Sequence, residues 1–392
     1  MDDNPEIYCQ DTSEVKINKF SLPLVSVIIV NYNYGRFLRE AADSVFAQNY
    51  PNIECIIVDN ASTDDSGGIL LDLSRQYPSA AILRRRDNGG QSIASKEGFE
   101  ASSGEYVVFL DADDVLLPAF IETHIFVHLS LRIPVGFSSA DMIQAVQSRM
   151  VLGTIYGLSE YVRSGRGKRS GIIRRVDESA PSMWPLRSPD AALEDLVHLM
   201  EPCDVGTWVW APTSGSCFRR DALQLFLNNE ALGALRSCTD AYLIRGISVL
   251  MGSVLIDRSL AVYRLHGMNV FSKHPHLYCM LSYERGGPSD DDQLGRKMVI
   301  DHLIANAKLF LRKLHSPHHY MNALLALDDA WPRLSSPVQG CRSYLAGKIV
   351  MEASALAPAL GLSNFIGWLK RLKVAPYVIL KAWLKHKKEK RS

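Results

Sequence analysis

The stretch LVSVIIVNYNYGRFLREAADSVFAQ, residues 24–48, decides the fold. Its first seven residues are apolar and mostly β-branched, which is typical of a short buried strand. The polar turn NYNYG follows, and the remainder places Phe37, Ala41 and Val45 at helical spacing. A buried strand that runs through a turn into an amphipathic helix predicts the first half of a β-α-β unit.

The same alternation repeats along the first third of the chain. Residues 54–58, 80–85 and 105–110 are predicted to be three further strands. Helices are expected between them, at residues 68–77 and 92–104. Alternating strands and helices at this spacing predict an α/β fold with a parallel sheet and right-handed crossovers.

Polar clusters follow each expected strand at the point where the strand ends. They are NYN at 31–33, DNAS at 59–62, NGG at 88–90 and DADD at 111–114. In a parallel sheet, ligands bind beyond the carboxyl ends of the strands. We therefore expect the four clusters to converge on one edge of the sheet, although they lie far apart in the chain.

The DADD cluster brings together three carboxylates, those of Asp111, Asp113 and Asp114. A turn is the ordinary explanation, because Asp favours turns and helix N-caps. However, carboxylates two residues apart repel each other unless a cation neutralises them, and Mg²⁺ or Mn²⁺ prefers oxygen ligands together with substrate phosphates. The chain has no GxxxxGK[ST] or GxGxxG loop, so the sequence favours a metal-bridged diphosphate over a P-loop or dinucleotide site.

The composition of the 392-residue chain is that of a globular protein, with 47% hydrophobic and 22% charged residues. A net charge of +1 provides no field that would attract nucleic acid. The seven cysteines form no CxxC pair or Cys/His cluster, so we expect reduced cytoplasmic thiols and no zinc site. We expect neither a signal peptide nor a transmembrane segment.

The run from Val25 to Ser66, followed by NGG and GEYVVFLDADD, resembles the family 2 glycosyltransferases. The resemblance is dense over residues 23–130 and ends near residue 275. It implies a GT-A fold, which is a Rossmann-like, mostly parallel sheet flanked by helices. It also implies a nucleotide-sugar donor and a divalent metal, Mn²⁺ or Mg²⁺.

The resemblance assigns the nucleotide side of the site to five residues. Tyr32 and Asn33 are expected to pack near the nucleotide base. Asp59 and Asn60 are expected to contact the base or the ribose, although family members often carry two acids at this point. Asn88, in NGG, is expected to lie near the nucleotide.

The metal side follows from two other motifs of the family. Asp111 is expected to touch the ribose, or the metal through water, and Asp113 to bind the metal directly. Asp114 is expected to be a cap or a supporting neighbour, since two acids suffice for a metal held mostly by diphosphate and water. The segment VYRLHGMN resembles a further family motif and suggests Arg264 and His266 as diphosphate or metal contacts. The alternative for His266 is an ordinary loop histidine.

An acceptor hydroxyl needs a base, and the family supplies one from an ED pair. In SCTDAYLIRG this pair is Thr239 and Asp240, so the first acid is replaced and Asp240 is the expected catalytic base. The alternative is a helix N-cap formed with Thr239. Asp204 and Glu201 are weaker candidates for the base.

Two basic segments lie outside these motifs. Residues 159–176 carry six Lys or Arg. They are expected to form either a solvated surface loop or a loop that binds an anionic acceptor. Beyond residue 290 the pattern is helical, and residues 363–392 carry nine Lys or Arg interleaved with Trp and Tyr. Such a tail is typical of a helix that lies on an anionic membrane, with a solvated tail as the alternative.

The predicted organisation has four parts: a mobile leader (1–22), a nucleotide-sugar-binding half (23–130), an acceptor-binding half (131–275) and a helical extension with a basic amphipathic tail (276–392). The predicted function is a non-processive, inverting, hexosyltransferase-type glycosyltransferase that acts on a glycan or lipid-linked acceptor in cell-surface polysaccharide synthesis. A nucleotidyltransferase and a non-catalytic nucleotide- or sugar-binding scaffold are the alternatives. We expect a cytoplasmic location, peripheral at the inner membrane face, and no nucleic-acid partner.

Overall fold

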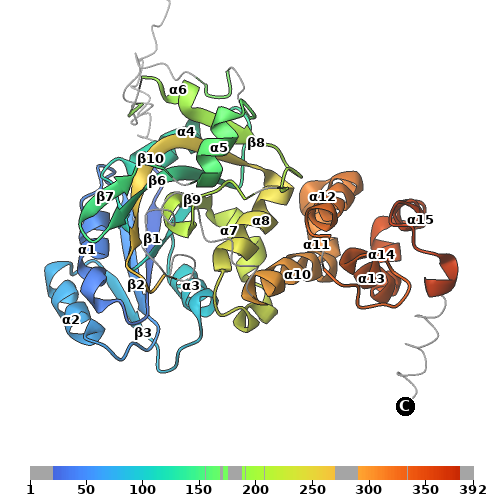
Figure 1. Ribbon diagram of the computed structural model, residues 1–392, viewed down its shortest axis with the longest axis horizontal. Coiled ribbons are helices and arrows are strands. Elements are labelled where there is room, and N and C mark those ends of the chain that lie inside the picture. Colours follow the sequence, from blue (N-terminus) through green and yellow to red (C-terminus); the bar gives the residue numbers. More distant parts are fainter. Residues whose placement is uncertain are drawn as a thin grey trace, which may run out of the picture.

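The computed structural model contains a ten-stranded sheet covered by helices, with a helical extension that projects from one side (Figure 1). The residues that it describes are 21–154, 156–167, 171–174, 188–189, 191–206, 208–269, 290–332 and 334–379. The predicted leader lies outside them up to residue 20, as do the start of the predicted extension, part of the basic loop and the tail beyond residue 379. No helix among the described residues is long and apolar enough to cross a membrane.

The N-terminal half of the sheet is parallel, as predicted. Its strands are ordered β3-β2-β1-β4. They are β1 (Val25–Asn31), β2 (Ile53–Asp59), β3 (Ala81–Arg84) and β4 (Tyr106–Asp111). Each strand ends at or near its predicted limit. β1, β2 and β4 are largely buried, as an apolar run predicts, whereas β3, at the edge of the sheet, is partly exposed.

Helices connect these strands where the sequence predicts them. They are α1 (Gly35–Phe46), α2 (Ser66–Gln76) and α3 (Gln91–Glu100). The buried stripe of α1 includes Leu38, Ala41 and Val45. Phe37 does not belong to this stripe; its ring instead lies 4.9 Å from the ring of His266. The helical period of α1 was therefore predicted correctly, but Phe37 contacts His266 instead of the core.

The C-terminal half of the sheet is mixed, whereas the sequence predicts a mostly parallel sheet. β9 runs antiparallel to both β4 and β6, and β10 runs parallel to β6. The strands of this half are β5 (Val115–Leu116), β6 (Phe137–Val146), β7 (Arg149–Leu152), β8 (Val197–Met200), β9 (Ser216–Arg219) and β10 (Ser253–Leu265). Four of the six are at most four residues long, so they carry little periodic signal.

The short strand β5 matters because it begins directly after the acidic cluster. It pairs antiparallel with β10, so that Val115 lies opposite Val262 and Leu116 opposite Ala261. In an antiparallel pair, the residues before one strand face the residues that follow along the other. The pairing therefore brings the DADD cluster to the end of β10, where Arg264 and His266 lie.

The remaining helices cover the sheet and build the extension. Between residues 120 and 251 they are α4 (Phe120–Ser130), α5 (Tyr156–Arg163), α6 (Leu193–Leu196), η1 (Thr213–Gly215), α7 (Arg220–Leu227), η2 (Glu230–Ala234) and α8 (Thr239–Met251). In the extension they are α10 (Asp290–Ala305), α11 (Ala307–Leu314), α12 (Pro317–Ala330), α13 (Tyr344–Met351), α14 (Ala353–Leu360) and α15 (Leu362–Arg371).

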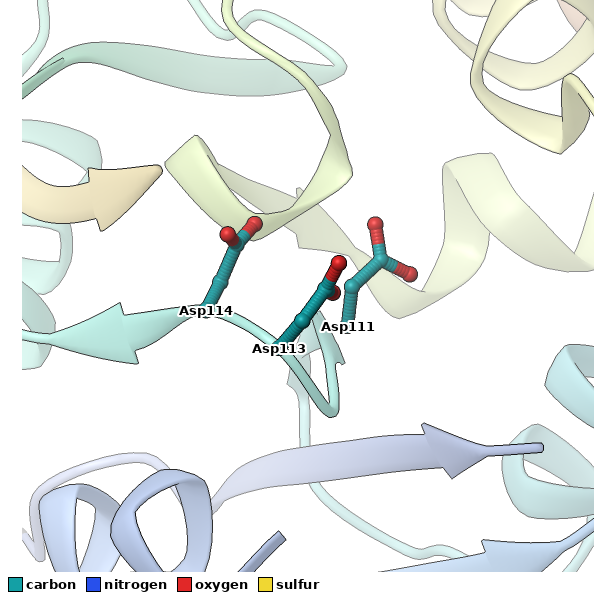
Figure 2. A group of neighbouring side chains, drawn as sticks. All are labelled: Asp111, Asp113 and Asp114. Carbon is teal, nitrogen blue, oxygen red and sulfur yellow. The ribbon is translucent and has the colours of Figure 1, made fainter. Parts of the chain in front are cut away.

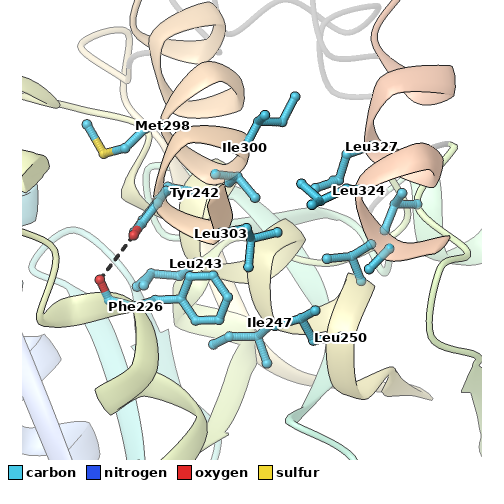
Figure 3. Packing of buried hydrophobic residues seen from close by; sticks show 14 of the residues in the cluster. Phe226, Tyr242, Leu243, Ile247, Leu250, Met298, Ile300, Leu303, Leu324 and Leu327 are labelled. Carbon is cyan, nitrogen blue, oxygen red and sulfur yellow. Dashed lines mark hydrogen bonds between the residues drawn. The ribbon is translucent and has the colours of Figure 1, made fainter. Parts of the chain in front are cut away.

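The extension shares a hydrophobic core with the rest of the protein (Figure 3). Leu243 and Ile247 of α8 belong to the same buried cluster as Leu303 of α10 and Leu324 of α12. Burying one such side chain contributes about 1.5–3 kcal/mol. Apolar packing of this extent fixes α8, and therefore the residues at its N-terminus, against the extension.

Candidate active site

The polar clusters that follow the strands converge on one sheet edge, as predicted. Asn31 and Asp59 end neighbouring strands and lie in register. The Asn31 side-chain amide donates to Asp59 Oδ1 at 2.9 Å, and both side chains are buried. The edge is therefore held by side-chain hydrogen bonds as well as by the sheet.

The NGG turn is tied to the end of β2 by two asparagines. Asn60 Nδ2 donates to Asn88 Oδ1 at 3.0 Å, and Asn60 Oδ1 accepts from the Gly89 amide at 3.0 Å. Gly90 has a φ of +83°, and an added Cβ would lie 2.7 Å from the Cα of Arg236. The turn therefore needs glycine for both its conformation and its close approach to the neighbouring chain.

The first loop is positioned by Asn33, which adopts a φ of +59°. Its side-chain oxygen accepts a hydrogen bond from the Thr63 amide at 2.7 Å. The neighbouring Tyr32 is 42% exposed. The structure thus places Asn33 as a link between two loops of the edge, and it leaves the Tyr32 ring free to meet a ligand.

The three carboxylates of the DADD cluster point to the same side (Figure 2). One oxygen from each of Asp111, Asp113 and Asp114 can be chosen so that all three lie within 4.8 Å of one another. Asp113 and Asp114 are buried. Because like charges at this separation repel strongly in a partly desolvated site, the cluster is poised to bind a cation.

The pKa values of Asp111 and Asp114 are raised, as repulsion between neighbouring carboxylates predicts. Burial, then the charges of Asp113 and Asp240, raise the pKa of Asp111 to about 7. Burial, then Asp113 and Asp111, raise the pKa of Asp114 well above its usual range. In the absence of a cation the cluster therefore retains protons that ordinary aspartates lose near pH 4.

The donor set fits a hard divalent cation. Asp114 Oδ1 accepts the Arg264 amide at 3.1 Å, whereas the buried Asp114 Oδ2 has no partner. A buried oxygen without a partner is costly, and a cation would satisfy it. The sequence reasoning treated Asp114 as a supporting neighbour, but the structure brings its carboxylate into the cluster.

His266 lies against the cluster. Its Nε2 lies 2.8 Å from Asp113 Oδ2, and its ring packs edge-on against Tyr34 at a centroid distance of 5.3 Å. The His266 amide donates to Asn269 Oδ1 at 3.0 Å, which holds the loop. The structure therefore brings His266 to the predicted metal residues, in direct contact with Asp113.

Arg264 is oriented differently from its predicted role. Its guanidinium pairs with Glu40 at 2.9 Å and lies over the ring of Phe37, both on α1. Only its backbone amide reaches the acidic cluster, through Asp114. The side chain thus braces β10 against α1.

Asp240 occupies the first turn of α8. Burial is the largest cause that raises its pKa, and its charge in turn raises the pKa of Asp111. The hydroxyl of Thr239 lies 2.7 Å from that of Ser92, and both are buried. Thr239 therefore links α8 to α3 and positions Asp240 beside the acidic cluster.

The rival acids for the base have other surroundings. Asp204 pairs with Arg166 at 3.2 Å near the surface. Glu201 is exposed and lines an apolar pocket of about 420 Å³ next to α11. The charge of Asp240, by contrast, acts on Asp111 of the DADD cluster.

Two further contacts to Asp111 were not predicted. Gln91 Nε2 donates to Asp111 Oδ1 at 3.1 Å, and the Asp111 amide donates to Ser214 Oγ at 3.1 Å. Gln91 directly follows NGG, so its position after a strand-end cluster was an available signal. Ser214 lies 103 residues away on η1, and no local pattern indicates it.

Comparison with known proteins finds similar glycosyltransferases. Residues 26–129 match the family model described as glycosyl transferase family 2. An uncharacterized glycosyltransferase of Nostoc sp. is 33% identical over 245 residues, which are 62% of this chain and 66% of that protein. Residues 26–129 are thus similar to glycosyl transferase family 2.

Other relatives match over a smaller share of the chain. Glycosyltransferase GlyG of Streptococcus pneumoniae is 37% identical over 26% of this chain and 33% of its own length. The putative teichuronic acid biosynthesis glycosyltransferase TuaG of Bacillus subtilis is 37% identical over 24% of this chain and 36% of its own length. The chain thus spans just under two thirds of the Nostoc relative and about a third of these two.

Among solved structures, S. aureus TarS in complex with UDP is similar at a TM-score of 0.45 and 14% identity, over 89% of this chain and 91% of that chain.

Proposed function

We propose that the protein is a non-processive, inverting glycosyltransferase that moves a hexose-type sugar from a nucleotide-sugar donor to a glycan or lipid-linked acceptor. One observation carries the proposal. In the acidic cluster at the strand ends, Asp114 Oδ2 is buried without a partner. The charge of Asp240, on the neighbouring helix α8, raises the pKa of Asp111 in the same cluster. A cation site beside a buried acid suits the transfer of a group from a diphosphate.

The donor would lie along the strand-end edge. Tyr32 and Asn33 would pack against the base, and Asp59 and Asn60 would meet the base or ribose. Asn88 would orient the nucleotide through the turn that it holds with Asn60. The hydrogen bonds among these side chains support a pre-organised site, which reduces the entropy lost on binding.

The metal would be held by Asp111 and Asp113, with His266 as a further ligand or as the group that orients Asp113. Asp114 adds a third carboxylate. A bound Mn²⁺ or Mg²⁺ supplies charge stabilisation for the leaving diphosphate. Oxygen ligands of this kind suit both ions.

Asp240 would act as the general base. Burial raises its pKa, and a more basic carboxylate accepts a proton more readily. In a single displacement, the acceptor oxygen forms a bond to the anomeric carbon, its proton goes to an Asp240 carboxylate oxygen, and the bond to the nucleoside diphosphate breaks on the opposite face. One carboxylate suffices for this inverting course.

The cellular role would be the synthesis of cell-surface polysaccharide at the inner membrane face. The match to TuaG, named for teichuronic acid biosynthesis, supports this role. On α15, Leu362 and Ile366 are 68% and 44% exposed and lie one turn apart, with exposed Lys370 a further turn along. An exposed apolar stripe next to basic residues favours contact with an anionic membrane.

Calorimetric titration of UDP and GDP, with and without Mn²⁺, tests the donor site. Wild type is expected to bind one nucleotide in a metal-dependent manner, and Asp113→Ala is expected to abolish that dependence. Asp72→Ala, an exposed acid that pairs with Arg39 on the outer helices, is the matched control. A nucleotide affinity that changes neither on addition of Mn²⁺ nor in Asp113→Ala contradicts the proposal.

Donor hydrolysis tests the chemistry. Asp240→Asn is expected to lower the rate of sugar release by a hundredfold or more, on the order of general-base effects, while nucleotide affinity stays unchanged. A wild-type protein that binds nucleotide but releases no sugar and transfers none would be a binding scaffold.

A further inference from the structure

A buried arginine close to Asp240 has no hydrogen-bonding partner. Arg245 lies on α8 and is 6% exposed. The centre of its guanidinium group lies 5.2 Å from the ring of Trp208 and 5.5 Å from the ring of Trp331. Its Nε has no partner, and no hydrogen bond or ion pair joins the group to the part of the chain that the structure describes.

Aromatic rings compensate the burial of this charge only in part. Burying a cation is costly unless a counter-charge and hydrogen bonds accompany it. Burial, then the charge of Arg296, lower the pKa of Arg245 to about 10, so the side chain remains protonated at neutral pH. The structure therefore keeps a full positive charge between two tryptophans, with the charges of Asp292 and Asp240 acting on it and with its buried Nε unpartnered.

A second arginine extends the same cluster. Arg296, on α10, lies 5.8 Å from the ring of Trp331 and pairs with Asp292 at 2.8 Å. Its Nε is also buried without a partner, as is the Nε1 of Trp331. Because every unpaired group here is a donor, only an acceptor can satisfy them. The Arg296 side chain is 24% exposed, so the cluster reaches the surface.

We propose that Arg245, Arg296 and Trp331 form a subsite for an anionic group, a phosphate or a carboxylate, that the acceptor substrate carries. The inference rests on the proposed function, because it takes Asp240 as the base that faces the acceptor. Arginine suits this task, since its planar fork of donors matches both oxyanions.

The position of the arginine cluster favours an anionic group of the acceptor over the donor diphosphate as its ligand. A metal held by the acidic cluster would supply the counter-charge for the diphosphate. Arg245 and Asp240 influence each other electrostatically along α8 without forming an ion pair. An acceptor whose anionic group lies on the arginines would therefore present a neighbouring hydroxyl towards Asp240.

Binding of inorganic phosphate and of glucuronate, measured by calorimetry in EDTA, tests the subsite with the acidic cluster free of metal. The variants are Arg245→Gln and Arg296→Gln. The matched control is Arg39→Gln, an arginine that already has a carboxylate partner, Asp72, at 3.1 Å. Circular dichroism verifies that each variant is folded, and Arg296, whose side chain is 24% exposed, keeps the test decisive if Arg245→Gln does not fold.

Wild type is expected to bind at least one of the two anions. Each cluster variant is expected to weaken that binding about tenfold or more, the loss of one hydrogen bond to a charged group, while Arg39→Gln leaves it unchanged. Preference for phosphate indicates a phosphate-ester acceptor, and preference for glucuronate indicates a uronic-acid acceptor.

Absence of anion binding by wild type, or equal binding by Arg296→Gln, overturns the inference and leaves the cluster as a packing contact between α8 and the extension. Titration of UDP with Mn²⁺, on the same protein preparations after EDTA has been removed, distinguishes the two failures. An incorrect proposed function removes nucleotide binding from wild type, whereas an incorrect subsite leaves it intact.

Discussion

The imidazole Nε2 of His266 lies 2.8 Å from Oδ2 of Asp113, although 153 residues separate them in the chain. The contact exists because β5 and β10 pair directly beside both residues. Replacing His266 with Gln should weaken Mn²⁺ affinity and donor hydrolysis by about 10–100-fold, the usual cost of removing a ligand's supporting partner.

Titration of hydrolysis rate against Mn²⁺ concentration measures this effect. His318→Gln, an exposed histidine on α12, is the matched control. A His266→Gln protein with an unchanged Mn²⁺ dependence would show that the histidine serves only the loop.

Stability without metal should depend on pH through Asp111. Its pKa is about 7 in the folded protein and near 3.8 when unfolded, so the folded state binds more protons between these values. The free energy of unfolding therefore falls as pH rises from about 4 to 7. Asp111→Asn should flatten this part of the profile, and Mn²⁺ should reverse the trend in wild type, because the ion binds the charged form.

Urea unfolding in EDTA at several pH values, for wild type and Asp111→Asn, measures the difference. Using the difference cancels the titration of the remaining groups. Parallel profiles for the two proteins would contradict the assigned pKa.

Arg264→Gln should affect stability more than nucleotide binding. The side chain pairs with Glu40, which is 67% exposed, so the pair contributes about 1 kcal/mol or less. Because the guanidinium faces α1, UDP affinity in Mn²⁺ should change by less than about twofold, within the effect of an exposed ion pair. A large loss of UDP affinity in a stably folded variant would instead support a direct diphosphate contact.

Membrane association should depend on the exposed stripe of α15. Changing Leu362 and Ile366 to Asp should reduce binding to anionic vesicles by tenfold or more, since each buried apolar side chain contributes about 1.5–3 kcal/mol. Leu71→Asp, on α2 and 54% exposed, is the control for an added charge. Vesicle sedimentation measures the effect, and equal binding by all variants would exclude this stripe.

Local patterns predicted the N-terminal half of the fold because each strand there is an apolar run that ends in a polar cluster. The same reasoning predicted the convergence of Asp59, Asn88 and Asp111 at one edge, which parallel topology requires. The direction of the Arg264 side chain could not be predicted, because it depends on Glu40 and Phe37 of a helix more than two hundred residues earlier.

Long-range packing limits what the sequence reveals about the rest of the site. The short strands of the mixed half have too few residues for a period to emerge. Ser214 reaches Asp111 only because η1 packs over the end of β4, and Arg245 is recognisable only once Trp208 and Trp331 are seen on both sides of it. Residues that support a site from distant elements have no local signature.

The shared core of α8 and the extension restricts how such enzymes can be recombined. Asp240 lies in the first turn of α8, and Leu243 and Ile247 of the same helix share a buried core with α10 and α12. A chimera that exchanges the extension between relatives must therefore place its junction before residue 239, or it will combine helix surfaces that were never matched. Since β10 follows α8 and carries His266 to the acidic cluster, the exchanged segment also brings its own half of the metal site. Acceptor choice and metal binding would thus be inherited together.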